Sequence, residues 1–210
     1  MKKNWHTPFA LALVLLFGLS LFYIGTDGFK AYTAETARVN SLIENQPQFP
    51  EVTFEDSKGR VYPVSEFDGK YVFITFMYTY CSTVCPILEM NMGQVYSQVP
   101  EEYIGEDIVF LSISFDPERD DPVTLAEYTG HFNADGDTWR MARINDQEEL
   151  DSLLEEFGVV VIPYENGDFA HNSAFYLVDR EGTLIDVMDY TEIGEAAERV
   201  NTILENDKGE

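Results

Sequence analysis

The chain has 210 residues, of which 38 are acidic and 13 basic, so its formal net charge is −25 at pH 7. Nucleic-acid phosphates are bound mainly by Lys and Arg, so this balance makes nucleic acid a poor partner and the sequence predicts none. The acidic residues are spread along the chain, and the length beyond the first 28 residues is enough for one well-packed domain.

The N-terminus is basic at Lys2 and Lys3 and continues into an uncharged, apolar stretch at residues 8–24. This stretch is at the short end of what can cross a bilayer, so residues 1–28 are predicted to be a transmembrane anchor. The positive-inside rule then predicts a single-pass protein of the cytoplasmic (inner) membrane whose domain faces the extracytoplasmic or periplasmic side. A cleaved signal peptide is the alternative, but no A-x-A-like cleavage site follows. A lipoprotein anchor is not expected, because no cysteine follows the stretch closely.

Four regions follow from the pattern of the chain. The segment after the anchor has helical composition and few core-type residues, which predicts a spacer helix. Gln46-Pro47 and Phe49-Pro50 interrupt it. The predicted boundaries are 1–28 for the anchor, 29–45 for the spacer helix, 46–204 for the folded domain and 205–210 for an acidic tail.

Within the domain, strand patterns alternate with helix patterns. A small hairpin is expected at 52–62, around the turn Asp56-Ser57-Lys58-Gly59. Strands are then predicted at 71–78, 107–115, 139–144, 174–178 and 183–187, and helices after Cys85, after Asp121-Pro122, around 150–157 and at 191–204. This alternation predicts an α/β fold with a central sheet and helices on both faces. The tight turn between the last two strands predicts an antiparallel edge.

The chain contains two cysteines, Cys81 and Cys85, where the strand at 71–78 passes into a helix. The helix is predicted because apolar residues recur on one face: Val84, Ile87, Leu88, Met92, Val95, Tyr96 and Val99. Exposed N–H groups and the helix dipole at such a junction favour thiolates, and positions four apart face the same side. We therefore expect an exposed site for a soft metal ion or a redox reaction. A structural disulfide or two buried thiols are the alternatives, although a bridge over four residues closes too short a loop to stabilise much.

The three histidines differ in position. His6 precedes the membrane stretch, and His131 falls at the end of the helix predicted after Asp121-Pro122 and lies off its apolar face. His171 lies in the polar segment 165–173, which is read as a loop that enters a strand. It is therefore the imidazole best placed to join the two thiols, and a Cys2His ligand set suits copper.

Taken together, these segments resemble the Sco/SenC family of membrane-anchored copper chaperones. The resemblance covers residues 46–204 and the N-terminal anchor. It is carried by Phe76-Met77-Tyr78-Thr79-Tyr80-Cys81 running to Cys85-Pro86, by Ser112-Ile113-Ser114-Phe115-Asp116-Pro117-Glu118-Arg119-Asp120, and by His171-Asn172-Ser173-Ala174-Phe175-Tyr176-Leu177-Val178-Asp179. It implies a thioredoxin-like fold, a Cu(I) or Cu(II) cargo, and a role in assembling the copper centre of cytochrome c oxidase subunit II.

The resemblance also implies roles for single residues. Cys81 and Cys85 would be the thiolate ligands, and His171 would be the third metal ligand. An oxidising extracytoplasmic space would in addition drive Cys81 and Cys85 to a redox-active disulfide. Asp116 would belong to the family's acidic segment near the site, although capping of the turn before a helix is an equal explanation. No residue is assigned a catalytic role.

The expected partners are subunit II, a protein that donates copper, and a thiol reductant that keeps the cysteines reduced in an oxidising compartment. The sequence departs from the family at Ser82 and Thr83, where Pro and an acidic residue are common. The missing negative charge beside the site is expected to change its redox poise or its preference for partners. The alternatives are a membrane-tethered thiol–disulfide oxidoreductase acting on the cysteines of a copper protein, a peroxiredoxin-like peroxidase, and a copper or redox sensor.

Overall fold

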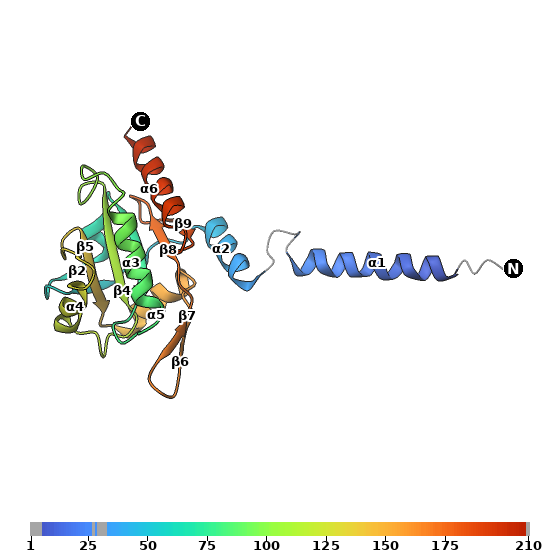
Figure 1. The fold of residues 1–210 in the computed structure, drawn as a ribbon, viewed down its shortest axis with the longest axis horizontal. Coiled ribbons are helices and arrows are strands. Elements are labelled where there is room, and N and C mark those ends of the chain that lie inside the picture. Colours follow the sequence, from blue (N-terminus) through green and yellow to red (C-terminus); the bar gives the residue numbers. More distant parts are fainter. Residues whose placement is uncertain (1–5, 27, 29–32, 209–210) are drawn as a thin grey trace. The chain divides into compact units, whose positions relative to one another are not determined.

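The computed structural model describes residues 6–26, 28 and 33–208, in two compact units, Met1–Glu44 and Asn45–Glu210 (Figure 1). The predictions that rest on Lys2 and Lys3, on residues 29–32 of the spacer helix and on residues 209–210 of the tail lie outside the described residues. The two units are described separately.

The first unit contains two helices. Helix α1 (His6–Gly25) is the one described helix that is long and apolar enough to cross a membrane, over Pro8–Gly25. At 1.5 Å per residue these 18 residues span about 27 Å, close to the thickness of a bilayer core. Helix α2 (Ala34–Asn45) begins where the Thr33 hydroxyl accepts a hydrogen bond from the Thr36 N–H at 3.0 Å, as a capping residue does.

The second unit is built on one seven-stranded mixed sheet, in the order β2-β1-β5-β4-β3-β8-β9. The three central strands β5, β4 and β3 run parallel, and an antiparallel hairpin closes each edge. The strands are β1 (Thr53–Asp56), β2 (Val61–Pro63), β3 (Tyr71–Met77), β4 (Ile108–Ser114), β5 (Trp139–Ile144), β8 (Phe175–Val178) and β9 (Leu184–Met188). The predicted α/β sheet, its first hairpin and its antiparallel last edge are confirmed.

Helices cover both faces of this sheet. They are α3 (Val84–Tyr96), α4 (Pro122–Thr129), α5 (Gln147–Glu156) and α6 (Ile193–Asp207), and a 3-10 turn lies at Val64–Phe67. Successive side chains of a strand point to opposite faces. On β3, the Thr75 hydroxyl donates to Glu89 of α3, whereas the ring of Phe76 packs edge-on against Phe157 at the end of α5. Helices α3 and α5 therefore lie on opposite faces of β3.

The region before β8 differs most from the prediction. A polar loop was expected at residues 165–173, but the structure has a separate two-stranded hairpin of β6 (Val161–Pro163) and β7 (Phe169–His171). The strands are only three residues long, too short for a periodic pattern to reveal them. Figure 1 shows this hairpin extending beyond the rest of the unit.

Three helix details also differ. Ile87, expected on the buried face of α3, is 52% exposed. Helix α4 ends at Thr129, so His131 lies in the turn after it and is exposed. Helix α6 continues to Asp207, three residues past the predicted end, so part of the expected acidic tail is helical.

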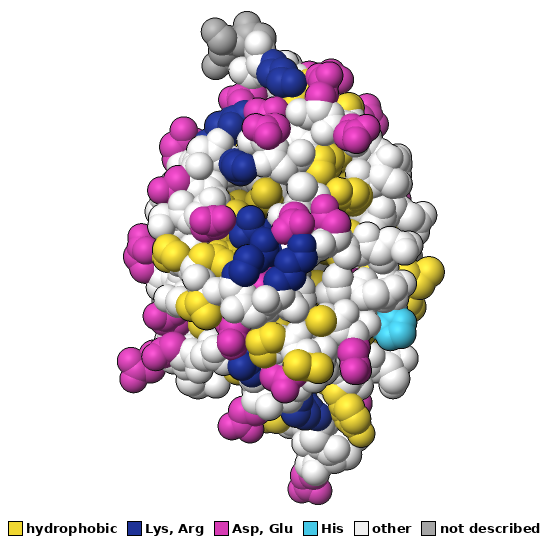
Figure 2. All heavy atoms as spheres, turned by 90° about the vertical axis from the view of Figure 1, so that its left-hand side faces the viewer, with side chains coloured by type: hydrophobic (Ala, Val, Ile, Leu, Met, Phe, Trp, Pro, Cys, Tyr) yellow, Lys and Arg dark blue, Asp and Glu magenta, His cyan; other side chains and the backbone are white. Residues whose placement is uncertain are grey.

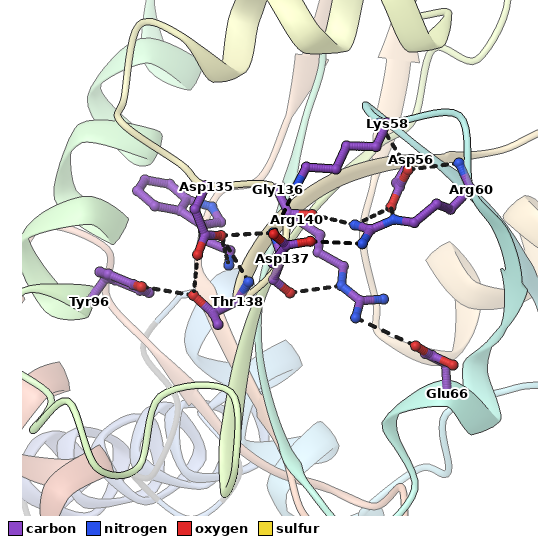
Figure 3. Close-up of polar contacts among 11 residues, drawn as sticks. Asp56, Lys58, Arg60, Glu66, Tyr96, Asp135, Gly136, Asp137, Thr138 and Arg140 are labelled. Atoms are coloured by element: carbon purple, nitrogen blue, oxygen red, sulfur yellow. Dashed lines mark hydrogen bonds and ion pairs between the residues drawn. The ribbon is translucent and has the colours of Figure 1, made fainter.

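Basic side chains gather on the face shown in Figure 2. At the β1–β2–β5 edge such side chains form the ion-pair network drawn in Figure 3. Arg60 donates to the buried Asp56 at 2.7 Å and to Asp137 at 2.8 Å, and Lys58 pairs with Asp137 at 2.6 Å. Arg140 lies over the Tyr62 ring at 4.9 Å. The network ties the edge hairpin to the turn before β5.

Candidate metal centre

Three chain segments bring the two cysteines and one histidine together. Cys81 lies in the turn after β3, Cys85 in the first turn of α3, and His171 is the last residue of β7. Their ligand atoms all lie within 4.8 Å of one another. Among the described residues, this is the group of metal-ligating side chains that the structure draws into one cluster. His131 is exposed and His6 lies on α1, so neither belongs to it.

The two thiols are less accessible than a strand-to-helix junction predicts. Cys81 is 6% exposed and Cys85 is fully buried, whereas His171 is half-buried. The expectation of exposed thiols is wrong, because the β6–β7 hairpin lies across the junction and contacts both Tyr78 and Cys85. Both cysteines are free.

The Cys81 sulfur takes the place of a capping side chain on α3. Thr83 occupies the N-cap position without a side-chain hydrogen bond, and the Cys85 N–H instead donates to Cys81 Sγ at 3.3 Å. The neighbouring Cys85 thiol, then His171 and the N–H groups of Cys85 and Thr83, lower the pKa of Cys81 well below the ordinary thiol range despite burial. Cys81 is therefore a thiolate at neutral pH.

Cys85 has the opposite character. Its hydrogen bond to the Cys81 thiolate and its burial both raise its pKa above the ordinary thiol range. Cys85 therefore keeps its proton, and the pair carries one negative charge. A single thiolate stabilised by a neighbouring thiol avoids placing two like charges in a buried site.

His171 is held in one tautomer by its backbone. Its Nδ1 lies 3.1 Å from the carbonyl oxygen of Asn172, and a carbonyl oxygen only accepts hydrogen bonds. Nδ1 therefore carries a proton, and Nε2 faces Cys85 Sγ at 3.5 Å. This is the orientation in which an imidazole can bind a metal ion or accept the Cys85 proton.

The hairpin that carries His171 is fastened to the end of β3 through Tyr78. The Tyr78 hydroxyl donates to the Asp168 carboxylate and accepts from the Phe169 N–H at 3.3 Å. Burial and this bond to Asp168 raise the pKa of Tyr78, so the phenol stays protonated and remains a donor. The rings of Tyr78 and Phe169 meet edge-to-face at 5.1 Å, and Phe115 packs on His171 at 5.0 Å.

Arg119 adds a second connection between the hairpin and the cysteine turn. Its guanidinium lies over the rings of Tyr80 at 4.9 Å and Phe169 at 5.4 Å. It also pairs with the carboxylate of Asp116. Asp116 thus holds Arg119 rather than capping a helix, since the N-cap of α4 is Asp121.

Asp120 was not singled out from the sequence, yet its carboxylate holds the start of the turn that carries Cys81. It is fully buried and accepts hydrogen bonds from the Thr79 N–H at 3.0 Å and from the hydroxyls of Thr79 and Ser114. Its place in the acidic segment 116–121 was the available signal, but the sequence alone does not show which of these carboxylates points inward.

Glu89 lies one turn of α3 beyond Cys85 and is also fully buried. It accepts hydrogen bonds from the hydroxyls of Thr75 at 2.7 Å and Ser112 at 2.6 Å. Burial raises its pKa to about 7, although these two hydroxyls lower it in part. An acidic residue within the apolar pattern of α3 was the sequence signal for this group.

Comparison with known proteins agrees with this geometry. The model of the SCO1/SenC family matches residues 42–205. The SCO1 protein homolog of Bacillus subtilis is 28% identical over 135 residues, covering 63% of this chain and 69% of that protein. Protein sco1 of Schizosaccharomyces pombe is 28% identical over 139 residues, 63% of this chain and 51% of that protein.

Solved structures show the same fold. A SCO1/SenC family lipoprotein from Bacillus anthracis is 27% identical and superposes with a TM-score of 0.65, over 73% of this chain and 95% of that one. Arabidopsis thaliana ScoI, solved with copper bound, has a TM-score of 0.65 at 20% identity, over 75% and 98% of the two chains. The second unit has the thioredoxin-like fold of these structures, and this chain belongs to the SCO1/SenC family.

Proposed function

We propose that this protein is a copper-binding metallochaperone that assists assembly of the copper centre of cytochrome c oxidase subunit II. The observation that carries the proposal is the group of Cys81, Cys85 and His171, whose ligand atoms lie within 4.8 Å of one another in a SCO1/SenC fold. Structures of ScoI from Arabidopsis thaliana and Bradyrhizobium japonicum were solved with copper bound.

The ligand chemistry suits copper in both oxidation states. Two sulfurs are soft ligands that favour Cu(I), and an imidazole nitrogen completes a set for Cu(II). Cys81 already lacks its proton, whereas Cys85 must lose its own to bind, so binding releases a proton. A thiol reductant keeps the cysteines reduced, and a donor protein loads the site with copper. The copper then passes to an acceptor by ligand exchange.

The proposed location is the cytoplasmic (inner) membrane, with the folded domain on the extracytoplasmic side. Helix α1 has the length and composition of a single-pass anchor. The proposed division is 1–28 for the anchor, 29–45 for the spacer, 46–204 for the copper-binding domain and 205–210 for the tail.

Copper titration of the full-length reduced chain tests the ligand set. We expect one copper per chain, and we expect Cys81→Ser and Cys85→Ser each to abolish tight binding because both soft ligands are needed. His171→Ala should weaken Cu(II) binding more than Cu(I) binding, because Cu(I) accepts two thiolates alone. His131→Ala is the matched control. An unchanged stoichiometry in the double cysteine variant would refute the assignment.

A thiol–disulfide oxidoreductase acting on the cysteines of a copper protein is the second candidate. The observation that favours it is the unequal pair of one thiolate and one protonated thiol, which suits attack on a disulfide followed by resolution. The two functions differ in their need for His171. In cells, His171→Ala should impair oxidase assembly nearly as much as Cys81→Ser if copper is delivered. Normal assembly in the His171 variant would favour the reductase.

A further inference from the structure

Most exposed apolar side chains of residues 45–208 lie on the chain segments that carry the candidate metal ligands. Within residues 45–208, eight large hydrophobic side chains are exposed: Val61, Tyr80, Ile87, Met90, Val123, Val160, Ile162 and Tyr164. Six of them, all except Val61 and Val123, lie on the segments that carry the three ligand residues. We name these six the apolar rim. Scattered exposed hydrophobics need no explanation, but six on three segments that meet at one site point to an interaction surface.

Each ligand segment contributes to the apolar rim. Tyr80 directly precedes Cys81 and is 65% exposed. Ile87 and Met90 are three residues apart on the exposed face of α3, within two turns of Cys85. Ile162 lies on β6, the strand paired with β7, in the hairpin that extends from the unit in Figure 1.

The burial of the thiols means that cargo leaves through direct contact. Cys85 is fully buried and Cys81 is 6% exposed, so an acceptor that takes an ion by ligand exchange must bring its own ligands against the turn and the hairpin. The segments around the site then become part of the interface. Apolar side chains at the centre of such a contact exclude water and supply most of its binding energy.

The charge around the apolar rim defines the partner further. Residues 78–92 and 158–173 contain no Lys or Arg, and Arg119, which lies over the rings of Tyr80 and Phe169, is paired with Asp116. A groove of about 530 Å³ borders the hairpin, and its apolar lining includes Phe115, Val159 and Phe169. Four carboxylates line it, from Asp116, Glu118, Asp151 and Glu155. Only Asp116 has a basic partner there, Arg119. Such a surface repels anionic lipid and attracts a protein with Lys or Arg beside an apolar patch.

We propose that the apolar rim and this acidic groove form the docking surface for the copper acceptor, a protein whose own site is bordered by apolar side chains and flanked by basic ones. The inference rests on the proposed function. The apolar rim contacts the acceptor where the metal site of this chain meets the metal site of the acceptor. The groove binds the basic side chains of the acceptor, which fixes the orientation of the complex and speeds association.

The test measures copper transfer from the full-length, Cu(I)-loaded chain in detergent to the soluble copper domain of cytochrome c oxidase subunit II. Ile162→Ser and Ile87→Ser should each lower the second-order transfer rate about tenfold, the effect of losing an interface anchor. Val61→Ser and Val123→Ser remove equally exposed apolar side chains elsewhere and should leave the rate unchanged. Copper titration of each variant checks that the site still loads as in the wild type.

A second arm tests the groove. Glu118→Lys with Asp151→Lys should slow transfer at low salt and remove most of the salt dependence seen with the wild-type chain. If the wild-type chain transfers copper and the variants at Ile87 and Ile162 transfer it at the same rate, the proposed docking surface is wrong, but the proposed function stands. If the wild-type chain transfers no copper to this acceptor, both the acceptor and the docking proposal fail.

Discussion

Cys81 and Cys85 have the same side chain, yet their surroundings hold them in different protonation states. The Cys81 sulfur accepts from the Cys85 thiol and from N–H groups at the start of α3, which favours its thiolate. Cys85 is the donor of that bond and is fully buried, which favours its thiol. The pair is thus ready to bind a cation at the cost of releasing one proton to solvent, which leaves Nε2 of His171, 3.5 Å from Cys85 Sγ, available as a ligand.

Glu89 is the residue whose titration should affect stability most clearly. Burial raises its pKa to about 7 in the fold, whereas an unfolded glutamate titrates near 4.5. The folded state therefore keeps a proton that the unfolded state loses. The stability associated with this proton is fully present below about pH 4.5 and is lost as pH rises through 7, by about 3 kcal/mol in all.

Replacing Glu89 by a neutral amide should remove this pH dependence. We expect Glu89→Gln to raise the free energy of unfolding relative to wild type by an amount that grows between pH 5 and pH 8. Urea unfolding of the full-length reduced chain, followed by tryptophan fluorescence, measures the difference at each pH. Glu101→Gln, at an exposed position, is the control and should show no such trend. A constant difference across this range would mean that Glu89 is ionised in the fold.

At the scale of elements, the β6–β7 hairpin decides where His171, the proposed third ligand, lies relative to the cysteines. It is a separate two-stranded sheet, so no ladder hydrogen bonds join it to the main sheet. Tyr78, at the end of β3, and Arg119, after β4, provide the contacts that hold it. Short elements fastened by a few side chains are the parts of a fold that open most readily.

Tyr78 is therefore expected to act as a positioning residue for His171. Tyr78→Phe removes the hydroxyl that bonds Asp168 and should weaken Cu(II) binding about tenfold, the scale of one hydrogen bond to a charged group. Cu(I) binding should change much less, because the two sulfurs remain in place. Competition titrations with each ion measure the two affinities.

Tyr164→Phe is the matched control for this variant, since Tyr164 precedes the turn of the same hairpin and its ring is exposed. It should leave both copper affinities unchanged. An equal loss of Cu(I) and Cu(II) affinity in Tyr78→Phe would show instead that Tyr78 supports the cysteine turn and not the hairpin.

At the scale of the whole molecule, one apolar helix precedes a folded unit whose surface is strongly acidic. We expect protease added to spheroplasts to digest the folded unit without lysis, because Lys2 and Lys3 favour a cytoplasmic N-terminus. A cytoplasmic protein detected in the same samples is the control for intact membranes. Digestion only after lysis would reverse the predicted orientation, and a soluble mature protein that begins near Gly25 would show that the segment is cleaved.

The sequence by itself determined the central strands of the sheet, because β3, β4 and β5 are long and apolar enough to be recognised singly. Strand β3, buried along its whole length, and helix α4, started by Asp121 and Pro122, both lie where the pattern predicts them. The sequence also placed two thiols at a strand-to-helix junction. These features depend on residues close together in the chain, which is the range that periodicity and capping report.

Only the tertiary structure decided how the site is assembled. His171 lies 86 positions from Cys85, and the distance of 3.5 Å between Nε2 and Sγ exists because the hairpin folds across the end of β3. The three-residue strands of that hairpin, the inward direction of Asp120 and the burial of the thiols have no local pattern. They arise from contacts between segments far apart in the chain, and the same contacts leave Ile87 on the outer face of α3.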